Sequence, residues 1–176
     1  MICWFRLICM KLLLMGMLAM GAMSAQDLLV KDATGQWKQA ITNVLKAAEK
    51  MPAEKYDYKA TPEVRTFGGF VGHIADATVM FCAAAAGEKK APAGAEKTMK
   101  TKDALVGSLK DSIDYCDKVY GGLTGASAVE PVKFFGQERT RAGILFFNNM
   151  HVYEHYGNLV TYMRSSGLVP PSSEGR

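Results

Sequence analysis

The chain has 176 residues, of which 49% are hydrophobic, and it carries a formal net charge of +4 with only three histidines. This length fits a single domain with at most a short appendage, and the apolar content excludes a disordered low-complexity chain. With 17 glycines and 6 prolines the chain is not a collagen. The charge is too small and too scattered to indicate a nucleic-acid partner.

The first 25 residues have the composition of an export signal. They contain Arg6 and Lys11 and no acidic residue, residues 12–23 are uncharged, and small residues follow. A run of this length is too short to span a membrane, which takes about 20 apolar residues. The alternative, a short anchor beginning near the N-terminus, is interrupted by the two basic residues. The sequence therefore predicts a secretory signal peptide over residues 1–25.

Cleavage after Ser24 or Ala25 would leave one mature domain, residues 26–176. We expect this domain to be exported to the periplasm or the extracellular space, with no membrane attachment once the signal is removed. Only Cys82 and Cys116 remain in the domain. An oxidising compartment allows a disulfide between them, and two separate buried thiols are the alternative.

The first helical pattern of the mature domain covers residues 33–51. Apolar residues recur at helical spacing from Trp37 to Ala48, and Pro52 ends the pattern. The following segment, 52–60, contains alternating tyrosines and is predicted to be extended.

A second helix is predicted from the Thr-Pro-Glu sequence at 61–63. The threonine can cap the helix, proline suits its first position and an acid suits its first turn. The pattern continues to Ala86, where Gly87 can adopt the left-handed conformation that ends many helices. Residues 88–100 are predicted to form a polar loop.

Two further helices complete the chain. The third is predicted to start near Thr101, with Asp103 in its first turn, and to end at Gly121. A second long loop covers 122–138, and the fourth helix covers 140–165 before a glycine and two prolines stop it. No strand-rich region or internal repeat is apparent, so the predicted fold class is all-α, a four-helix bundle.

All three histidines of the chain fit one metal site. His151 and His155 are four residues apart on the fourth helix, so they project from the same face. His73 lies midway along the second helix and can add a third ligand across the bundle. Three protein nitrogens with one open position form the arrangement of catalytic zinc sites. The alternative for each histidine is a hydrogen-bonded core residue.

Other polar residues accompany the histidines on the helical wheel. Asn148, Asn158 and Tyr162 fall on the same stripe of the fourth helix as its histidines, and Asp76 lies one turn beyond His73. Buried polar groups need partners, so the amides are predicted to support the metal ligands from a second shell. Hydrogen bonds between helices are the alternative for the amides, and a solvated position is the alternative for Asp76.

Three residues are candidates for catalysis beside the metal. Helical spacing offers Asp76 and Glu154 as proton acceptors, and Tyr162 could donate to a developing anion. The HVYEH run at 151–155 also matches the inverted zinc-protease signature, in which Glu154 would be the general base. We discount that signature because Glu174, in a Pro/Ser/Gly tail, is the only acid after it.

Two segments carry a resemblance to a known family. Residues 51–77 read MPAEKYDYKATPEVRTFGGFVGHIADA, and residues 148–173 read NNMHVYEHYGNLVTYMRSSGLVPPSS. A Thr-Pro-Glu segment before a helix with one histidine, then a helix with His-x-x-x-His-Tyr-Gly and a Pro-Pro stop, resembles the DinB/YfiT-like superfamily of metalloenzymes.

The resemblance implies a four-helix bundle that binds one divalent metal ion, zinc or nickel, through His73, His151 and His155. Relatives are often homodimers, and they include thiol-dependent transferases, isomerases and suggested hydrolases. We therefore expect a DinB-like metal-dependent hydrolase or transferase with an unknown small-molecule substrate. A non-catalytic metal-binding or stress-response protein is the alternative. Low-molecular-weight thiols are cytosolic reductants, so an exported chain fits thiol transfer less well.

The direction of the second and third helices decides whether the cysteines can meet. In an antiparallel hairpin Cys82 and Cys116 would lie at opposite ends, roughly 15 Å apart by helix rise. In a parallel pair they would lie at the same level and could form a disulfide. The loop at 88–100 is long enough for such a crossover, so a disulfide is our hypothesis for this pair.

Overall fold

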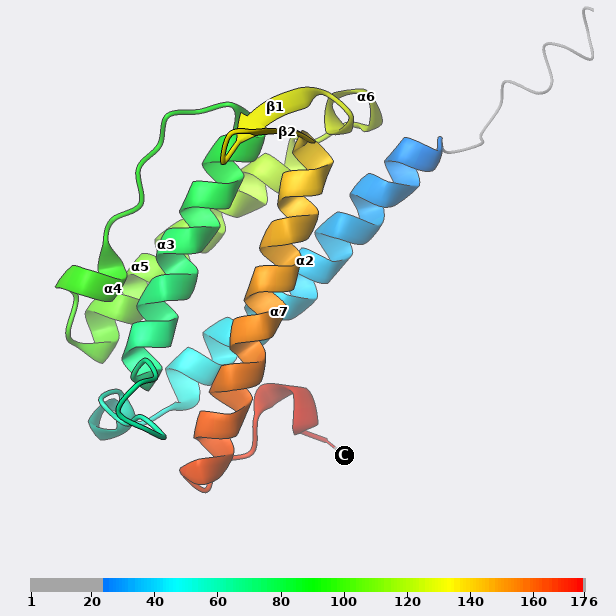
Figure 1. The fold of residues 1–176 in the computed structure, drawn as a ribbon. Helices are drawn as coiled ribbons and strands as arrows, with labels where there is room; N and C mark the ends of the chain where they lie inside the picture. The colour runs from blue at the N-terminus through cyan, green and yellow to red at the C-terminus, as the bar shows by residue number, and fades with distance from the viewer. Residues whose placement is uncertain (1–23, 176) are drawn as a thin grey trace, which may run out of the picture.

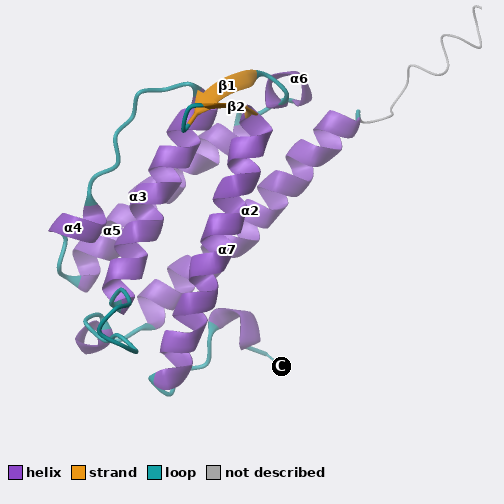
Figure 2. Cartoon of the chain, viewed as in Figure 1, coloured by secondary structure: helices purple, strands orange, loops and turns teal. Residues whose placement is uncertain are grey.

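The structure, a computed structural model, describes residues 24–175. The predicted signal peptide lies outside the described residues except for Ser24 and Ala25, so it stays a prediction. Four long helices form a bundle (Figures 1 and 2), which confirms the predicted all-α four-helix class. They are α2 (Ala25–Lys50), α3 (Phe67–Ala86), α5 (Lys102–Gly121) and α7 (Arg141–Ser165).

Short elements occupy the connections between the long helices. Residues 52–60, predicted to be extended, contain a 3-10 turn instead, and the predicted loop at 122–138 contains a small helix and most of an antiparallel hairpin. The short elements are η1 (Ala53–Lys55), α4 (Ala95–Thr98), α6 (Gly125–Ala128), β1 (Pro131–Phe134), β2 (Gln137–Thr140) and η2 (Pro171–Ser173).

Most helix ends follow their local capping signals. Thr101 and Thr140, near which the third and fourth helices are predicted to start, cap α5 and α7, and each accepts a hydrogen bond from a backbone N–H three residues on. Gly87 ends α3 in the left-handed conformation, with a φ of 74°. Helix α2 begins at Ala25, eight residues before the predicted start, because Ser24 and Asp27 form a capping box.

The predicted start of the second helix at 61–63 is wrong, because α3 begins at Phe67 with Thr66 as its cap. Residues 59–66 form turns before the helix. The Phe67 N–H donates to the Tyr58 carbonyl at 2.9 Å and the Gly68 N–H donates to the Tyr56 carbonyl at 2.8 Å. These bonds fold the segment back on itself and delay the helix by one turn.

Helices α3 and α5 are parallel, and the chain crosses between them through residues 88–101 along the outside of the bundle (Figure 1). Cys82 and Cys116, each near the C-terminal end of its helix, therefore lie at the same level. Their Cα atoms are 5.5 Å apart and the sulfurs form a disulfide. The disulfide hypothesis is confirmed.

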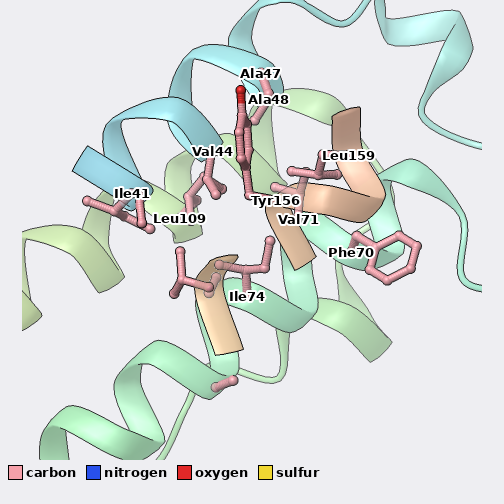
Figure 3. Packing of buried hydrophobic residues seen from close by; sticks show 14 of the residues in the cluster. Ile41, Val44, Ala47, Ala48, Phe70, Val71, Ile74, Leu109, Tyr156 and Leu159 are labelled. Carbon is pink, nitrogen blue, oxygen red and sulfur yellow. The ribbon is translucent and has the colours of Figure 1, made fainter. Parts of the chain in front are cut away.

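The hydrophobic core draws on all four long helices. Val44 of α2, Ile74 of α3, Leu109 of α5 and Leu159 of α7 are all fully buried and meet in the centre (Figure 3). Helix α3 packs against both α5 and α7. By length and hydropathy α3 could cross a membrane, but 67% of its apolar window is buried inside the bundle. This helix places the histidine it carries beside α7.

Candidate metal centre

The three histidines meet between α3 and α7. His73 projects from α3, and His151 and His155 project from successive turns of α7. The Nε2 atom of His151 lies 3.1 Å from Nε2 of His73 and 3.1 Å from Nε2 of His155. The three rings therefore direct the same nitrogen toward one point, as the sequence spacing predicts.

This nitrogen cluster has the dimensions of a metal site. Two ligand atoms about 2.0–2.1 Å from a tetrahedral zinc ion lie roughly 3.3–3.4 Å apart, close to the observed separations. Without a shared cation, neutral Nε2 lone pairs at this distance repel one another. The side chains form a group of three ligand atoms that could hold one metal ion.

Electrostatics keep two of the ligands neutral. Burial lowers the pKa of His151 to about 4, and the nearby charges of His73 and Arg65 act in the same direction. Burial also lowers the pKa of His155 to about 4, with contributions from His151, His73 and Arg65. A metal ion binds the neutral imidazole, so both rings are in the ligand form at neutral pH.

A carboxylate that the sequence patterns do not reveal supports the first ligand. Oε2 of Glu96 lies 2.9 Å from Nδ1 of His73, and Oε1 accepts a hydrogen bond of 2.7 Å from Arg65 Nε. Burial opposes ionisation of Glu96, but the bonds from Arg65 and His73 outweigh it and hold the pKa of this carboxyl below its ordinary value. Accepting the Nδ1 proton fixes the His73 tautomer that leaves Nε2 free.

Glu96 reaches the site because α4 lies against α3. The carboxylate of Asp76 accepts hydrogen bonds from the backbone N–H groups of Ala95 and Glu96, at 2.9 and 3.1 Å. Gly72, one residue before His73, allows the two backbones to touch, since a Cβ there would lie 2.7 Å from the Glu96 nitrogen. Asp76 thus holds α4 in place and does not contact the histidines.

Only one of the two predicted supporting amides reaches a histidine. The side-chain amide of Asn158 lies 3.2 Å from Nδ1 of His155. The atom at this distance is the amide nitrogen Nδ2, and the contact helps to hold the orientation of the His155 ring. Asn148 instead points toward the disulfide and donates to the Tyr120 hydroxyl at 3.2 Å, so the structure corrects its assignment to the metal's second shell.

The remaining catalytic candidates lie away from the Nε2 cluster. The Tyr162 hydroxyl donates to the Arg65 carbonyl at 2.7 Å, so it joins α7 to the segment before α3. Glu154 is exposed on α7, and no hydrogen bond or ion pair connects its carboxylate to another described residue. No hydrogen bond connects either side chain to the three histidines among the described residues.

Aromatic rings surround the histidines on their protein side. The ring centroid of Phe81 lies 5.3 Å from that of His151, and the centroid of Phe70 lies 5.5 Å from that of His155. The side chain of His73 is 23% exposed. The candidate centre is thus apolar on its inner side and accessible to solvent on its outer side.

Comparison with protein families gives one match. The sequence profile of the DinB superfamily matches residues 36–159, which include all three histidines and Glu96. No curated protein matches the chain.

Solved structures share the fold. A DinB-like protein from Bacillus cereus superposes with a TM-score of 0.71 at 15% identity, covering 80% of this chain and 95% of that one. A DinB-like protein from Bacillus subtilis gives 0.66 at 20% identity, covering 82% and 99%. A mycothiol-dependent maleylpyruvate isomerase gives 0.62 at 14% identity, and the match covers 74% of this chain and 60% of that one.

Proposed function

Because the chain belongs to the DinB superfamily, we propose that it binds one divalent metal ion and uses it as a hydrolase or transferase of a small molecule. His73, His151 and His155 are the proposed ligands. The observation that carries this proposal is the convergence of their three Nε2 atoms, with 3.1 Å between neighbours. Imidazole ligands suit zinc and nickel, which are the proposed metals.

Neighbouring residues orient the three histidines, and three ligands would leave one coordination position of the ion open. A divalent ion held by three imidazoles supplies Lewis-acid chemistry. Glu96 and Asn158 orient the rings of His73 and His155 through their Nδ1 atoms. Phe70 and Phe81 exclude water from the protein side of the site, which strengthens electrostatic interactions there.

The ligand set favours catalysis over a structural metal. Structural zinc sites use four protein ligands, whereas catalytic sites use three and keep one position open. Among the described residues the group contains three ligands, and the nearest carboxylate, Glu96, is engaged with His73 and Arg65. A non-catalytic metal-binding or stress-response protein remains the second candidate, because a stable three-histidine site can also sequester an ion.

Export is part of the same proposal. The predicted signal over residues 1–25 would direct the domain to an oxidising compartment, and the Cys82–Cys116 disulfide suits such a compartment. One structural relative is a mycothiol-dependent isomerase. An oxidising location is a poor source of that reduced thiol, so we favour hydrolysis over thiol transfer.

The first test is the metal content of the purified mature domain, expressed with zinc and nickel supplied. We expect about one equivalent in the unaltered protein, because three imidazoles that converge on one point bind either ion tightly. His151→Ala removes the central ligand and should lose the metal. Glu154→Gln alters an exposed carboxylate on the same turn of α7 and should keep it. Less than about half an equivalent in the unaltered protein would contradict the metal site.

A second measurement separates the two functional candidates. The metal-loaded protein is screened against ester, amide and phosphoester substrates, with the chelated protein and His151→Ala as controls. A catalytic centre predicts turnover that metal removal abolishes while circular dichroism still shows a folded bundle. Unfolding on chelation without any turnover would favour the non-catalytic candidate.

A further inference from the structure

An exposed phenylalanine occupies a strained position at the tip of the hairpin. Phe135 and Gly136 join β1 to β2 as a two-residue turn, with φ values of 48° and 75°. Such turns favour glycine, asparagine or aspartate, since positive φ costs other residues free energy. Phe135 is 75% exposed, so core burial does not account for an aromatic residue here. Strained backbone positions cluster at functional sites, so the conformation of Phe135 marks this turn as a candidate binding feature.

The hairpin forms one wall of a pocket against the start of α7. The hairpin lies across the ends of α3 and α7 (Figure 1). The pocket has a volume of about 280 Å³, just below the range of roughly 300–1,000 Å³ for small-molecule sites. Its walls are mostly aromatic or aliphatic: Phe134, Phe135, Gln137, Arg139, Ile144 and Phe147.

One buried ring connects this pocket to the candidate metal centre. The centroid of Phe81 lies 5.5 Å from that of Phe134 and 5.3 Å from that of Phe147, both of which line the pocket. On its other side Phe81 lies 5.3 Å from His151. Phe147 is also one helical turn from His151, an axial rise of about 6 Å. The buried Phe81 ring therefore lies between the pocket and His151, so the pocket is next to the candidate metal centre but is not lined by the histidines.

The pocket contains one cationic group. Arg139 donates to the Gln137 side chain at 2.7 Å, and it forms no ion pair with a carboxylate of the described residues. Phenylalanine rings bind planar groups by stacking, and a guanidinium binds carboxylates and other oxyanions. The pocket is therefore complementary to a molecule with both features.

We propose that this hairpin pocket is a binding site beside the metal centre, and that it takes a small molecule with an aromatic ring and an anionic group. The ring lies among Phe134, Phe135 and Phe147, and the anion pairs with Arg139. The nearness to a metal ion rests on the proposed function, but binding in the pocket is independent of the metal.

The test uses 2-naphthoate as the probe, titrated into the mature protein by calorimetry in zinc-loaded and chelated forms. We expect saturable binding to both forms. Phe147→Ala removes a wall of the pocket and should weaken binding by about tenfold. Tyr153→Ala removes an exposed aromatic side chain from α7 outside the pocket and should leave binding unchanged.

The charge assignment is tested with an uncharged analogue. Arg139→Gln should weaken 2-naphthoate binding by about fivefold, as expected for loss of an exposed charge-assisted bond. The same variant should bind 2-naphthalenemethanol as the unaltered protein does. Equal losses for both probes would contradict a role for Arg139 in anion binding.

The position beside the metal has its own readout. In cobalt-substituted protein, the protons of bound 2-naphthoate should relax faster than in zinc protein, because the pocket is close to the paramagnetic ion. Absence of binding to a protein that holds its metal would overturn the pocket and leave the metal site standing. If the protein takes up neither zinc nor nickel but still binds 2-naphthoate, the metal site is overturned and the pocket stands. A dimer that Phe135→Ser dissolves and that blocks the probe would assign the surface to a second copy and overturn the proposal.

Discussion

The hydrogen bond between Glu96 and His73 sets which ring nitrogen of that histidine is free. The carboxylate, held ionised by Arg65, accepts the Nδ1 proton. Nε2 then carries the lone pair that faces the other two histidines. A carboxylate in this position also increases the basicity of the ligand nitrogen. The metal affinity of the centre should therefore depend on Glu96 although it does not join the Nε2 cluster.

Replacing Glu96 with glutamine tests this dependence. The amide keeps the size of the side chain but loses the charge, so we expect zinc affinity to fall by about tenfold. Competition with a chromogenic chelator measures the change. Glu88→Gln is the matched control, because this carboxylate belongs to the same crossover but binds the Tyr115 hydroxyl. An unchanged affinity in Glu96→Gln would show that Glu96 only pairs with Arg65.

At this scale the sequence predicts the histidines better than their partners. His151 and His155 follow from helical periodicity alone, because four residues make about one turn. Glu96 is 23 residues from His73 and lies in α4, within a segment that the sequence predicts to be a polar loop, so only the folded chain reveals it. Asn148 and Asn158 share a stripe on the helical wheel, but the wheel does not give height along the axis. The two amides differ in their position along the helix axis: Asn158 lies beside His155, whereas Asn148 lies beside the disulfide.

Helix α4 can place Glu96 beside His73 because its backbone lies close to that of α3 at Gly72. A Cβ on Gly72 would lie 2.7 Å from the Glu96 nitrogen and 2.8 Å from its Cα. Because these are backbone atoms, α4 would have to move as a unit and would carry the Glu96 side chain away from His73. The backbone contact and the support of the ligand are therefore the same feature.

Gly72→Ala should destabilise the protein by about 1–3 kcal/mol and should also weaken zinc binding. Urea unfolding and chelator competition measure the two effects. Gly35→Ala is the control, because Gly35 is an exposed position of α2 where a Cβ would meet nothing within 4 Å. This substitution should stabilise the protein by about 0.5–1 kcal/mol. Normal zinc affinity in Gly72→Ala would disprove the coupling of α4 to the site.

The elements themselves were predictable where local chemistry decides them. Thr101, Thr140 and Gly87 mark helix ends through capping, which depends on neighbouring residues. The Thr-Pro-Glu sequence at 61–63 carries the same signals, but the helix starts later because the N–H groups of Phe67 and Gly68 bond to the carbonyls of Tyr58 and Tyr56. The hairpin strands have only four residues each: β1 alternates between exposed and half-buried positions, and β2 is exposed throughout. Such short runs give too little periodicity to predict a strand.

For the whole molecule, the disulfide is a major constraint. Cys82 and Cys116 are 34 residues apart and join two parallel helices. In the chain-entropy account, closing a loop of this length stabilises the fold by about 3–4 kcal/mol. The cross-link also encloses the crossover that carries Glu96.

Replacing both cysteines with alanine should lower the free energy of unfolding by about this amount, roughly 3–4 kcal/mol. Urea denaturation with and without dithiothreitol provides the measurement and its control. The reductant should lower the stability of the unaltered protein and leave the double variant unchanged. The unaltered protein is also unfolded and refolded in the presence of the reductant, so that the disulfide is fully reduced. If its free energy of unfolding is then unchanged, the cross-link does not contribute to stability.

Helix α3 takes part in both links between helices of the bundle, the disulfide and the proposed metal site. The disulfide ties it to α5 near one end, and the proposed metal would tie it to α7 through the three histidines. Helix α2 has neither kind of tie among the described residues. It is held by packing and by bonds such as that from Trp37 to Asp117. The disulfide and the proposed metal therefore link α3, α5 and α7 to one another, whereas α2 is held by non-covalent contacts. We expect α2 to be the first of the four long helices to detach on unfolding, while the three linked helices stay together.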